Sequence, residues 1–160
     1  MQTFIEPVAR SHAFELFQWL DNDIGSREFI ARSVPPCADC TELLDQLLTA
    51  VRNGGFHAWV LRIASGEIIA YAELKKTDKV STHELELIYV VAKDWRNKSA
   101  GTTLIRKLLA SEVQGLCDVI VAYINPDNHA SRQVLIKNQF TEAPGTVEGI
   151  RYVYEVKSRQ

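Results

Sequence analysis

The chain has 160 residues, of which 46% are hydrophobic and 24% charged, and its formal net charge is −2 at pH 7. This length suffices to bury one core, so we expect a single domain over residues 1–160. The near-balance of charge, without long runs of one sign, argues against binding to nucleic acid or to an anionic membrane, and no apolar run approaches the roughly 18 residues of a membrane span. We therefore expect a cytoplasmic protein.

The first half of the chain predicts a strand, three helices and a hairpin. Residues 3–7 are apolar enough for a short strand, and Ser11 is a plausible cap for the helix that follows. A second short helix is expected within residues 24–34. A third is expected over 41–53, where leucines recur at helical spacing. The β-rich runs 57–63 and 67–76, joined through a glycine turn, predict the hairpin, and a loop follows over 75–81.

The three cysteines are too few, and odd in number, for a disulfide-stapled secreted fold. Cys37 and Cys40 have the C-x-x-C spacing of half a zinc site or of a redox dithiol. A zinc ribbon requires a second such pair, which the sequence lacks, and a redox dithiol follows a strand, whereas Pro35 and Pro36 stand here. We predict that Cys37 and Cys40 are ordinary thiols beside a helix start, and that the protein holds no metal.

The second half of the chain alternates between strands and helices. The expected elements are a strand at 84–91, a helix at 100–115, a strand at 118–124, a helix at 128–138 and a closing strand near 152–156. Antiparallel strands in the first half and a parallel crossover in the second predict an α/β (α+β) fold. Its central sheet is expected to be mixed and mostly antiparallel, with helices on both faces.

The stretch WRNKSAGTT, residues 95–103, lies between the strand at 84–91 and the helix that begins near residue 100. The first N–H groups of a helix have no partner within the helix and carry its positive dipole end, which suits a phosphate or pyrophosphate. Neither the Walker A pattern nor the G-x-G-x-x-G dinucleotide pattern occurs. An ATPase and an NAD enzyme are therefore both disfavoured.

Residues 96–101 resemble the R-x-x-G-x-G/A pyrophosphate loop of the GNAT superfamily of acyl-CoA N-acyltransferases, with Ser99 in place of the middle glycine. Residues 128–140 resemble the GNAT segment N-x-x-S/A-x-x-hydrophobic-hydrophobic-x-K-x-G-F, with Gln139 in place of its glycine. The matching residues of this segment are Asn128, Ser131, Lys137 and Phe140. Serine at 131 with leucine at 135 is similar to the branch of ribosomal-protein N-terminal acetyltransferases.

This resemblance implies a GNAT-like fold and an acetyl group moved from acetyl-CoA, as co-substrate, to a primary amine of a protein N-terminus or small molecule. The protein would be a monomer or homodimer. The pantetheine chain would lie between the central strand and the next parallel strand, with an N–H near Val91 polarising the thioester carbonyl. The implied cofactor contacts are Tyr89, Val90, Val91, Arg96, Asn97, Lys98, Ser99, Ala100, Gly101, Thr102 and Asn128. We expect Arg96 or Lys98 and the Gly101 amide to carry most of the pyrophosphate contact, because the Cβ of Ser99 narrows the approach.

Transfer from a thioester to an amine requires a neutral amine, donors for the oxyanion and a proton for the departing thiolate. Many GNAT enzymes supply this proton from a tyrosine, whose position here is Leu135. The expected replacement is Ser131, one turn earlier on the same helix face. Glu86 is the expected general base because it is nearer the thioester end of its strand than Glu84 is. The remaining alternatives for the base are Glu84, Glu73, His83 and Tyr89.

At pH 7 an α-amine is about 14% neutral and a lysine amine about 0.04%, so an α-amine fits weak acid and base groups better. We expect the acceptor pocket around the first two helices, near Phe17, Trp19 and Phe29 and within residues 24–36. Two alternatives stay open. One is a non-catalytic acyl-CoA-binding or regulatory domain of the same fold, which the missing glycines and Leu135 favour. The other is a phosphate-binding domain unrelated to CoA.

Overall fold

The computed structural model describes residues 1–33, 39–77, 83–146 and 149–157. Its centre is a seven-stranded sheet in the order β1-β2-β3-β4-β5-β7-β6. Neighbouring strands are antiparallel, except that β4 and β5 are parallel. The strands are β1 (Thr3–Pro7), β2 (Phe56–Ile63), β3 (Ile68–Lys76), β4 (Glu84–Val91), β5 (Val119–Ile124), β6 (Thr141–Thr146) and β7 (Gly149–Glu155).

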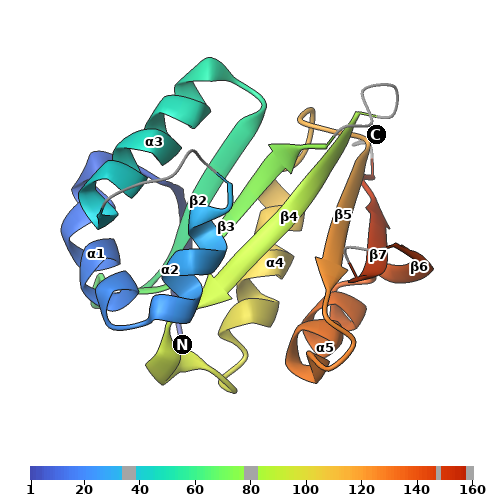
Figure 1. Ribbon diagram of the computed structural model, residues 1–160. Helices are drawn as coiled ribbons and strands as arrows, with labels where there is room; N and C mark the ends of the chain where they lie inside the picture. The colour runs from blue at the N-terminus through green and yellow to red at the C-terminus, as the bar shows by residue number, and fades with distance from the viewer. Residues whose placement is uncertain (34–38, 78–82, 147–148, 158–160) are drawn as a thin grey trace.

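The helices cover both faces of this sheet (Figure 1). On one face lie α1 (Ala13–Asp21), α2 (Ile24–Ala31) and α3 (Cys40–Asn53), and on the other α4 (Ala100–Ser111) and α5 (His129–Lys137). Two 3-10 turns, η1 (Arg10–His12) and η3 (Lys93–Trp95), precede α1 and α4. The predicted fold class, a mixed and mostly antiparallel sheet between helices, is confirmed.

Each face of the sheet has its own hydrophobic core. The core beneath α4 and α5 takes its helical members from Leu104, Ile105 and Leu108 of α4, which recur at helical spacing, and from Leu135 of α5, all fully buried. On the other face, leucines of α3 pack with Tyr71 and Val90. Alternate residues of β4 therefore point into different cores, with Leu85, Leu87, Tyr89 and Val91 on the α4 side.

The prediction of a single closing strand near 152–156 is wrong in extent, because β6 and β7 form a hairpin there. The sequence of β6 is TEAPGT, and proline and glycine are depleted in strands, so no periodic pattern marks it. β6 lies at the edge of the sheet. Pro144 is tolerated there because proline lacks a backbone N–H, and on the outer side of an edge strand no neighbouring strand needs that donor.

One predicted helix, 100–115, is longer than the observed one, whereas the helix expected within residues 24–34 lies inside its range. α4 ends at Ser111 rather than at residue 115, yet Val113 beyond it is fully buried, so the apolar spacing continues past the helix. α2 ends at Ala31, and residues 34–38, with Cys37, lie outside the described residues. Over the described ranges, no three or more His, Cys, Asp or Glu side chains are grouped to hold a metal ion. Nor does any helix there have the length and apolar character needed to cross a membrane.

Candidate active site

The parallel strands β4 and β5 pair over only three residues each. The last pair joins Glu86 to Val121. Beyond it, β4 continues to pair with β3 as far as Val91, and β5 pairs with β7 as far as Ile124. The two strands consequently diverge toward their carboxyl ends (Figure 1). The edge of β4 that faces this opening has peptide groups without a partner strand, and such an edge can hydrogen-bond an extended ligand.

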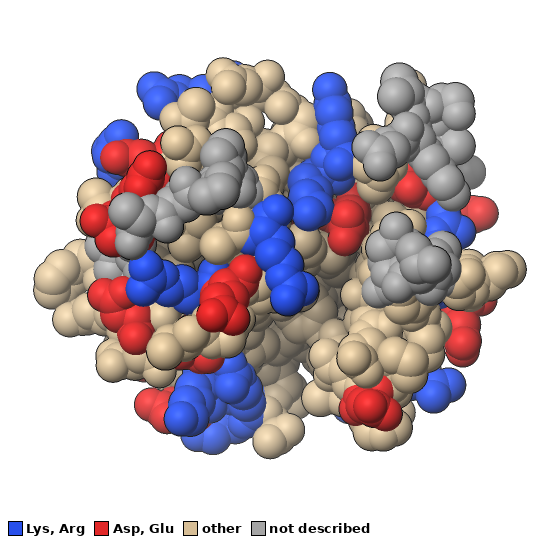
Figure 2. All heavy atoms as spheres, in the orientation of Figure 1, with Lys and Arg blue, Asp and Glu red and all other residues tan. Residues whose placement is uncertain are grey.

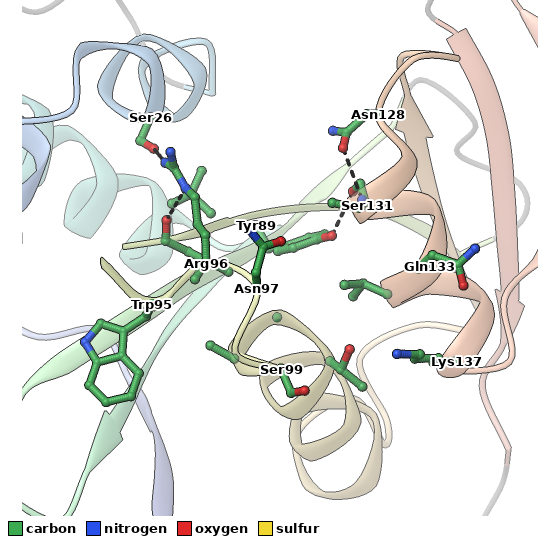
Figure 3. Close-up of a pocket in the computed structure, with 17 residues that line it drawn as sticks. Ser26, Tyr89, Trp95, Arg96, Asn97, Ser99, Asn128, Ser131, Gln133 and Lys137 are labelled. Carbon is green, nitrogen blue, oxygen red and sulfur yellow. Dashed lines mark hydrogen bonds between the residues drawn. The ribbon is translucent and has the colours of Figure 1, made fainter. Parts of the chain in front are cut away.

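A cavity of about 600 Å³ occupies the opening beside α4 and α5, and we call it the α4–α5 cavity (Figure 3). The end of β4, the loop after η3, the first turn of α4 and one face of α5 line it. All cofactor contacts expected from the sequence line this cavity except Lys98, and Ser131 lines it too. Side chains that the sequence analysis did not assign also line it, namely Ser26, Trp95, Ala130, Gln133, Val134 and Lys137.

Two left-handed residues shape the loop before α4. Asn97 has a φ of 60° and Ser99 a φ of 64°. Asparagine tolerates this conformation, whereas serine adopts it at a cost, and Ser99 stands where the family pattern has glycine. No side chain caps α4, and its first turn has no acidic residue. The N–H groups at residues 100–102, all lining the cavity, therefore remain available to an anion.

Tyr89 and Ser131 meet at the centre of the opening (Figure 3). The Tyr89 hydroxyl oxygen lies 2.7 Å from Ser131 Oγ, and Asn128 Oδ1 accepts a hydrogen bond of 3.1 Å from the Ser131 N–H, capping α5. Burial raises the pKa of Tyr89 above its usual value, and the hydrogen bond with Ser131 offsets part of this effect. The phenol therefore remains a protonated donor near neutral pH.

Gly101 lies directly beneath Tyr89. A Cβ on Gly101 would lie 3.3 Å from Tyr89 Cε2 and 3.4 Å from Val134 Cγ2, which is tighter than most side-chain contacts. The glycine matched in the sequence therefore has a packing role, because it lets α4 approach both β4 and α5. At the far end of α5, the buried Asn138 side chain donates to the carbonyls of Val134 (2.9 Å) and Thr102 (3.3 Å), which ties the two helices together.

The cations near the loop differ in where they lie. Arg96 Nη2 lies 2.5 Å from Asp23 Oδ2 and 3.2 Å from Ser26 Oγ, so its guanidinium binds the start of α2 (Figure 3). Lys98 Nζ lies 5.4 Å from the centroid of the Trp95 ring and does not line the cavity. Lys137 does line it, from α5. The sequence feature that indicates this position is helical spacing, because residues 130, 133, 134 and 137 share one face of α5.

None of the acidic candidates for a general base lines the α4–α5 cavity. Glu86 Oε2 lies 4.0 Å from Lys75 Nζ, and Glu84 is buried, with Arg151 Nη2 at 2.8 Å. Glu73 is fully buried beneath α2 and α3, where its carboxyl oxygens accept hydrogen bonds from the Ser33 and Tyr71 hydroxyls. Burial raises the pKa of Glu73 to about 7, although these two hydrogen bonds lower it. His83 is exposed on the loop before β4.

A second cavity, of about 720 Å³, lies beside α2, and we call it the α2 cavity. Residues of α2 line it together with residues 87–90 of β4 and the segment from the end of β5 to the start of α5. The surface in Figure 2 is hollowed between the parts that carry α2 and α5. Phe29 lines the α2 cavity, Trp19 packs in the core instead, and the Phe17 side chain lies outside the described part of the structure.

The two cavities share one set of lining residues and therefore lie next to each other. The shared residues are Ser26, Tyr89, Val90, Arg96, Asn128 and Ser131. α4 and α5 supply most of the remaining lining of the first cavity, and α2 with the end of β5 that of the second. Molecules in the two cavities would thus lie side by side near the Tyr89 and Ser131 hydroxyls. Two substrates could react there directly.

Comparisons with known proteins agree with this architecture. Residues 2–141 match the family model for the acetyltransferase (GNAT) domain. Spermidine N-acetyltransferase from Vibrio cholerae, solved with CoA and spermine, is 17% identical with a TM-score of 0.76, covering 97% of this chain and 96% of that one. Ribosomal-protein-S5-alanine acetyltransferase from Vibrio fischeri is 14% identical with a TM-score of 0.73, covering 98% and 94%.

Mycobacterium smegmatis RimJ, solved with CoA-disulfide, is 18% identical with a TM-score of 0.73, covering 96% of this chain and 81% of that one. Among curated protein sequences nothing matches significantly. At these identities the structural likeness shows the fold, and the family model extends over most of the chain. The chain belongs to the GNAT acetyltransferase family.

Proposed function

We propose that this protein is an N-acetyltransferase that moves an acetyl group from acetyl-CoA to a primary amine by direct attack. The observation that carries the proposal is the junction of the two cavities at Tyr89 and Ser131. An acyl donor in the α4–α5 cavity and an amine in the α2 cavity can meet there. Direct transfer in this arrangement requires no nucleophile from the enzyme itself.

The residues of the α4–α5 cavity fit acetyl-CoA as a substrate. The uncapped start of α4, with Lys137 opposite on α5, suits the pyrophosphate. The unpaired edge of β4 up to Val91, with Asn128 across the opening, suits the amide groups of the pantetheine chain. We propose that Arg96 acts mainly by holding the loop to α2, because its guanidinium binds Asp23 and Ser26.

Ser131 and Tyr89 are the proposed proton donors for the leaving group. The amine nitrogen attacks the thioester carbonyl carbon, a C–N bond forms, and the C–S bond breaks. The departing thiolate takes the proton of Ser131 Oγ, which Tyr89 can replace across their 2.7 Å hydrogen bond. Because a thiol has an ordinary pKa of about 8.5, this assistance can be modest and still suffice.

The attacking amine must also lose a proton, and none of the predicted carboxylate bases lines either cavity to accept it directly. Glu86 remains the predicted base, but it lines neither cavity, so it would act through water. An α-amine, about 14% neutral at pH 7, depends little on such a base. We therefore favour an acceptor whose amine titrates near neutral pH. The V. fischeri and V. cholerae relatives, which act on a protein alanine and on spermidine, illustrate the range within the family.

None of the carboxylates proposed as the general base lines either cavity. This observation also favours one alternative, a non-catalytic acyl-CoA-binding domain. Calorimetry with acetyl-CoA followed by a screen of N-terminal peptides, amino acids and polyamines for CoA release separates the two. Saturable binding together with amine-dependent CoA release supports the enzyme. Binding without release by any amine supports the alternative, and no binding at millimolar acetyl-CoA would remove both.

A further inference from the structure

Arg32 presents a guanidinium group to the α2 cavity. It follows the last residue of α2, where it is exposed, and its guanidinium carbon lies 5.8 Å from the centroid of the Phe29 ring. Phe29 also lines this cavity, so the ring supports the side chain from within it. With respect to the described residues, the Arg32 guanidinium forms neither an ion pair nor a hydrogen bond. Its N–H donors are therefore available to a ligand.

The charged side chains lining the α2 cavity do not cancel. Among the residues that the structure describes, they are Asp23, Arg32 and Arg96. Asp23 is already paired with Arg96 at 2.5 Å, and it also accepts hydrogen bonds from the Ser26 hydroxyl (2.9 Å) and N–H (3.3 Å). The one carboxylate among the described lining residues is thus occupied by a lining cation, so within this described lining Arg32 leaves an excess of positive charge. A carboxylate can accept two parallel hydrogen bonds from one edge of such a group, because its two oxygens match the guanidinium fork.

We propose that the acceptor amine also carries a carboxylate and that Arg32 binds it, an inference that rests on the proposed function. A polyamine in the same cavity would place a second ammonium group near Arg32, where the described lining holds no unpaired acid to compensate it. Arg32 therefore selects for an acceptor with a negative end. Tight binding of a polycation would require the opposite charge in this cavity.

The position of Arg32 also sets the length of the acceptor. Ser26 is the residue of α2 at the junction of the two cavities, and Arg32 follows six residues later. A helix rises about 1.5 Å per residue, so the two backbones lie about 9 Å apart along the axis. Several bonds must then separate the reacting amine from the carboxylate. A short peptide with a free carboxyl terminus meets this requirement better than a single amino acid.

The test compares three acceptors in a CoA-release assay with the full-length protein and saturating acetyl-CoA. They are a tripeptide of small neutral residues with a free carboxyl terminus, the same tripeptide as its C-terminal amide, and spermidine. Two variants accompany the wild type. Arg32→Gln removes the guanidinium from the cavity. Arg27→Gln is the matched control, because Arg27 lies on the same helix, pairs with Asp21 at 3.6 Å and does not line the α2 cavity.

We expect the wild type to have a KM for the free-acid tripeptide about tenfold lower than for the amide, as a charge-assisted hydrogen bond would give. Arg32→Gln should abolish this difference, while Arg27→Gln should keep both the difference and the kcat of the wild type. Equal KM values for acid and amide in the wild type, or a preference for spermidine, would overturn the role of Arg32 while the acetyltransferase proposal stands. No CoA release with any amine would overturn both.

Discussion

The hydroxyl oxygens of Tyr89 on β4 and Ser131 on α5 lie 2.7 Å apart, although 42 residues separate them in the sequence. The family position for a proton-donating tyrosine, one turn later on α5, holds Leu135, which is fully buried. A phenol therefore reaches the opening from the strand rather than from the helix. This pair gives Ser131, a weak acid by itself, a second hydroxyl from which its proton can be replaced.

Removing either hydroxyl should slow acetyl transfer without weakening acetyl-CoA binding much. We expect Ser131→Ala to lower kcat on the order of 100-fold, at the low end for general acid catalysis, and Tyr89→Phe roughly 10-fold. The double variant should lose little more than Ser131→Ala, because the two groups act as one chain. The measurement is kcat with an accepted amine, with Ser111→Ala, an exposed serine of α4, as the control. Full kcat in both single variants would exclude this role.

Ser99 and Gly101 should respond in opposite ways to substitution. Ser99→Gly removes the cost of a serine in the left-handed conformation, which is about 1 kcal/mol. Glycine also raises the conformational entropy of the unfolded chain, so we expect the protein to gain less than about 1 kcal/mol in stability. Its acetyl-CoA affinity should stay equal or rise. Gly101→Val pushes on Tyr89 and Val134, so we expect its Kd to rise more than about 10-fold, as a misplaced binding group would cause.

Calorimetry with acetyl-CoA measures both affinities, and thermal unfolding of the free proteins shows whether Gly101→Val is folded at the assay temperature. Gly101→Ala should raise the Kd for acetyl-CoA by less than Gly101→Val does, because it adds only one methyl group, which would lie 3.3 Å from Tyr89 Cε2. Equal affinities for Ser99→Gly and Gly101→Val would contradict a pyrophosphate site at the start of α4.

The sequence predicts those parts of this fold that repeat locally. Leu104 and Leu108 lie on one helical face, and their burial follows from that spacing. The family pattern has glycine at the positions of Ser99 and Gln139, and both residues have positive φ here, so the pattern predicted a backbone shape even where the glycine is absent. β6 was missed because nothing in TEAPGT alternates, and only its pairing with β7 makes it a strand.

The site depends on contacts that no local pattern contains. Arg96 binds Asp23, 73 residues away, so the same arginine that matched the family loop also holds α2. Lys98 looked equivalent to it in sequence but lies over Trp95. Lys137 was part of the matched segment, yet only the packing of α5 beside α4 places it at the cavity. Which cation meets which partner is decided by the tertiary structure.

Lys137 should contribute more to acetyl-CoA binding than Lys98. Lys137 lines the α4–α5 cavity, whereas Lys98 does not, and both are exposed cations on nearby elements. We expect Lys137→Gln to raise the Kd for acetyl-CoA roughly 5- to 10-fold at low salt and less at high salt, since screening weakens an exposed contact. Lys98→Gln should change it less than about twofold. Titrations at two salt concentrations measure both effects, and a larger loss for Lys98→Gln would assign the contact to the loop.

Glu73 should make the stability of the protein fall as pH rises. Its carboxyl group is fully buried, and burial raises its pKa from 4.5 to about 7, so the folded state holds this proton more tightly than the unfolded chain does. The resulting stabilisation is complete below pH 4.5 and is lost as the pH rises through 7. At ~1.4 kcal/mol for each pKa unit, the unfolding free energy should decrease by about 3 kcal/mol across this range.

Glu73→Gln should remove this decrease. An amide stays neutral at every pH, and it can accept a hydrogen bond from one of the Ser33 and Tyr71 hydroxyls while donating one to the other. Urea unfolding at pH 5, 6, 7 and 8 measures the difference, with Glu142→Gln, an exposed glutamate near Arg132, as the control. We expect Glu73→Gln to match the wild type near pH 5 and to exceed it at pH 8, whereas Glu142→Gln follows the wild type throughout. Parallel curves for Glu73→Gln and the wild type would mean that Glu73 is charged in the folded protein over this whole range.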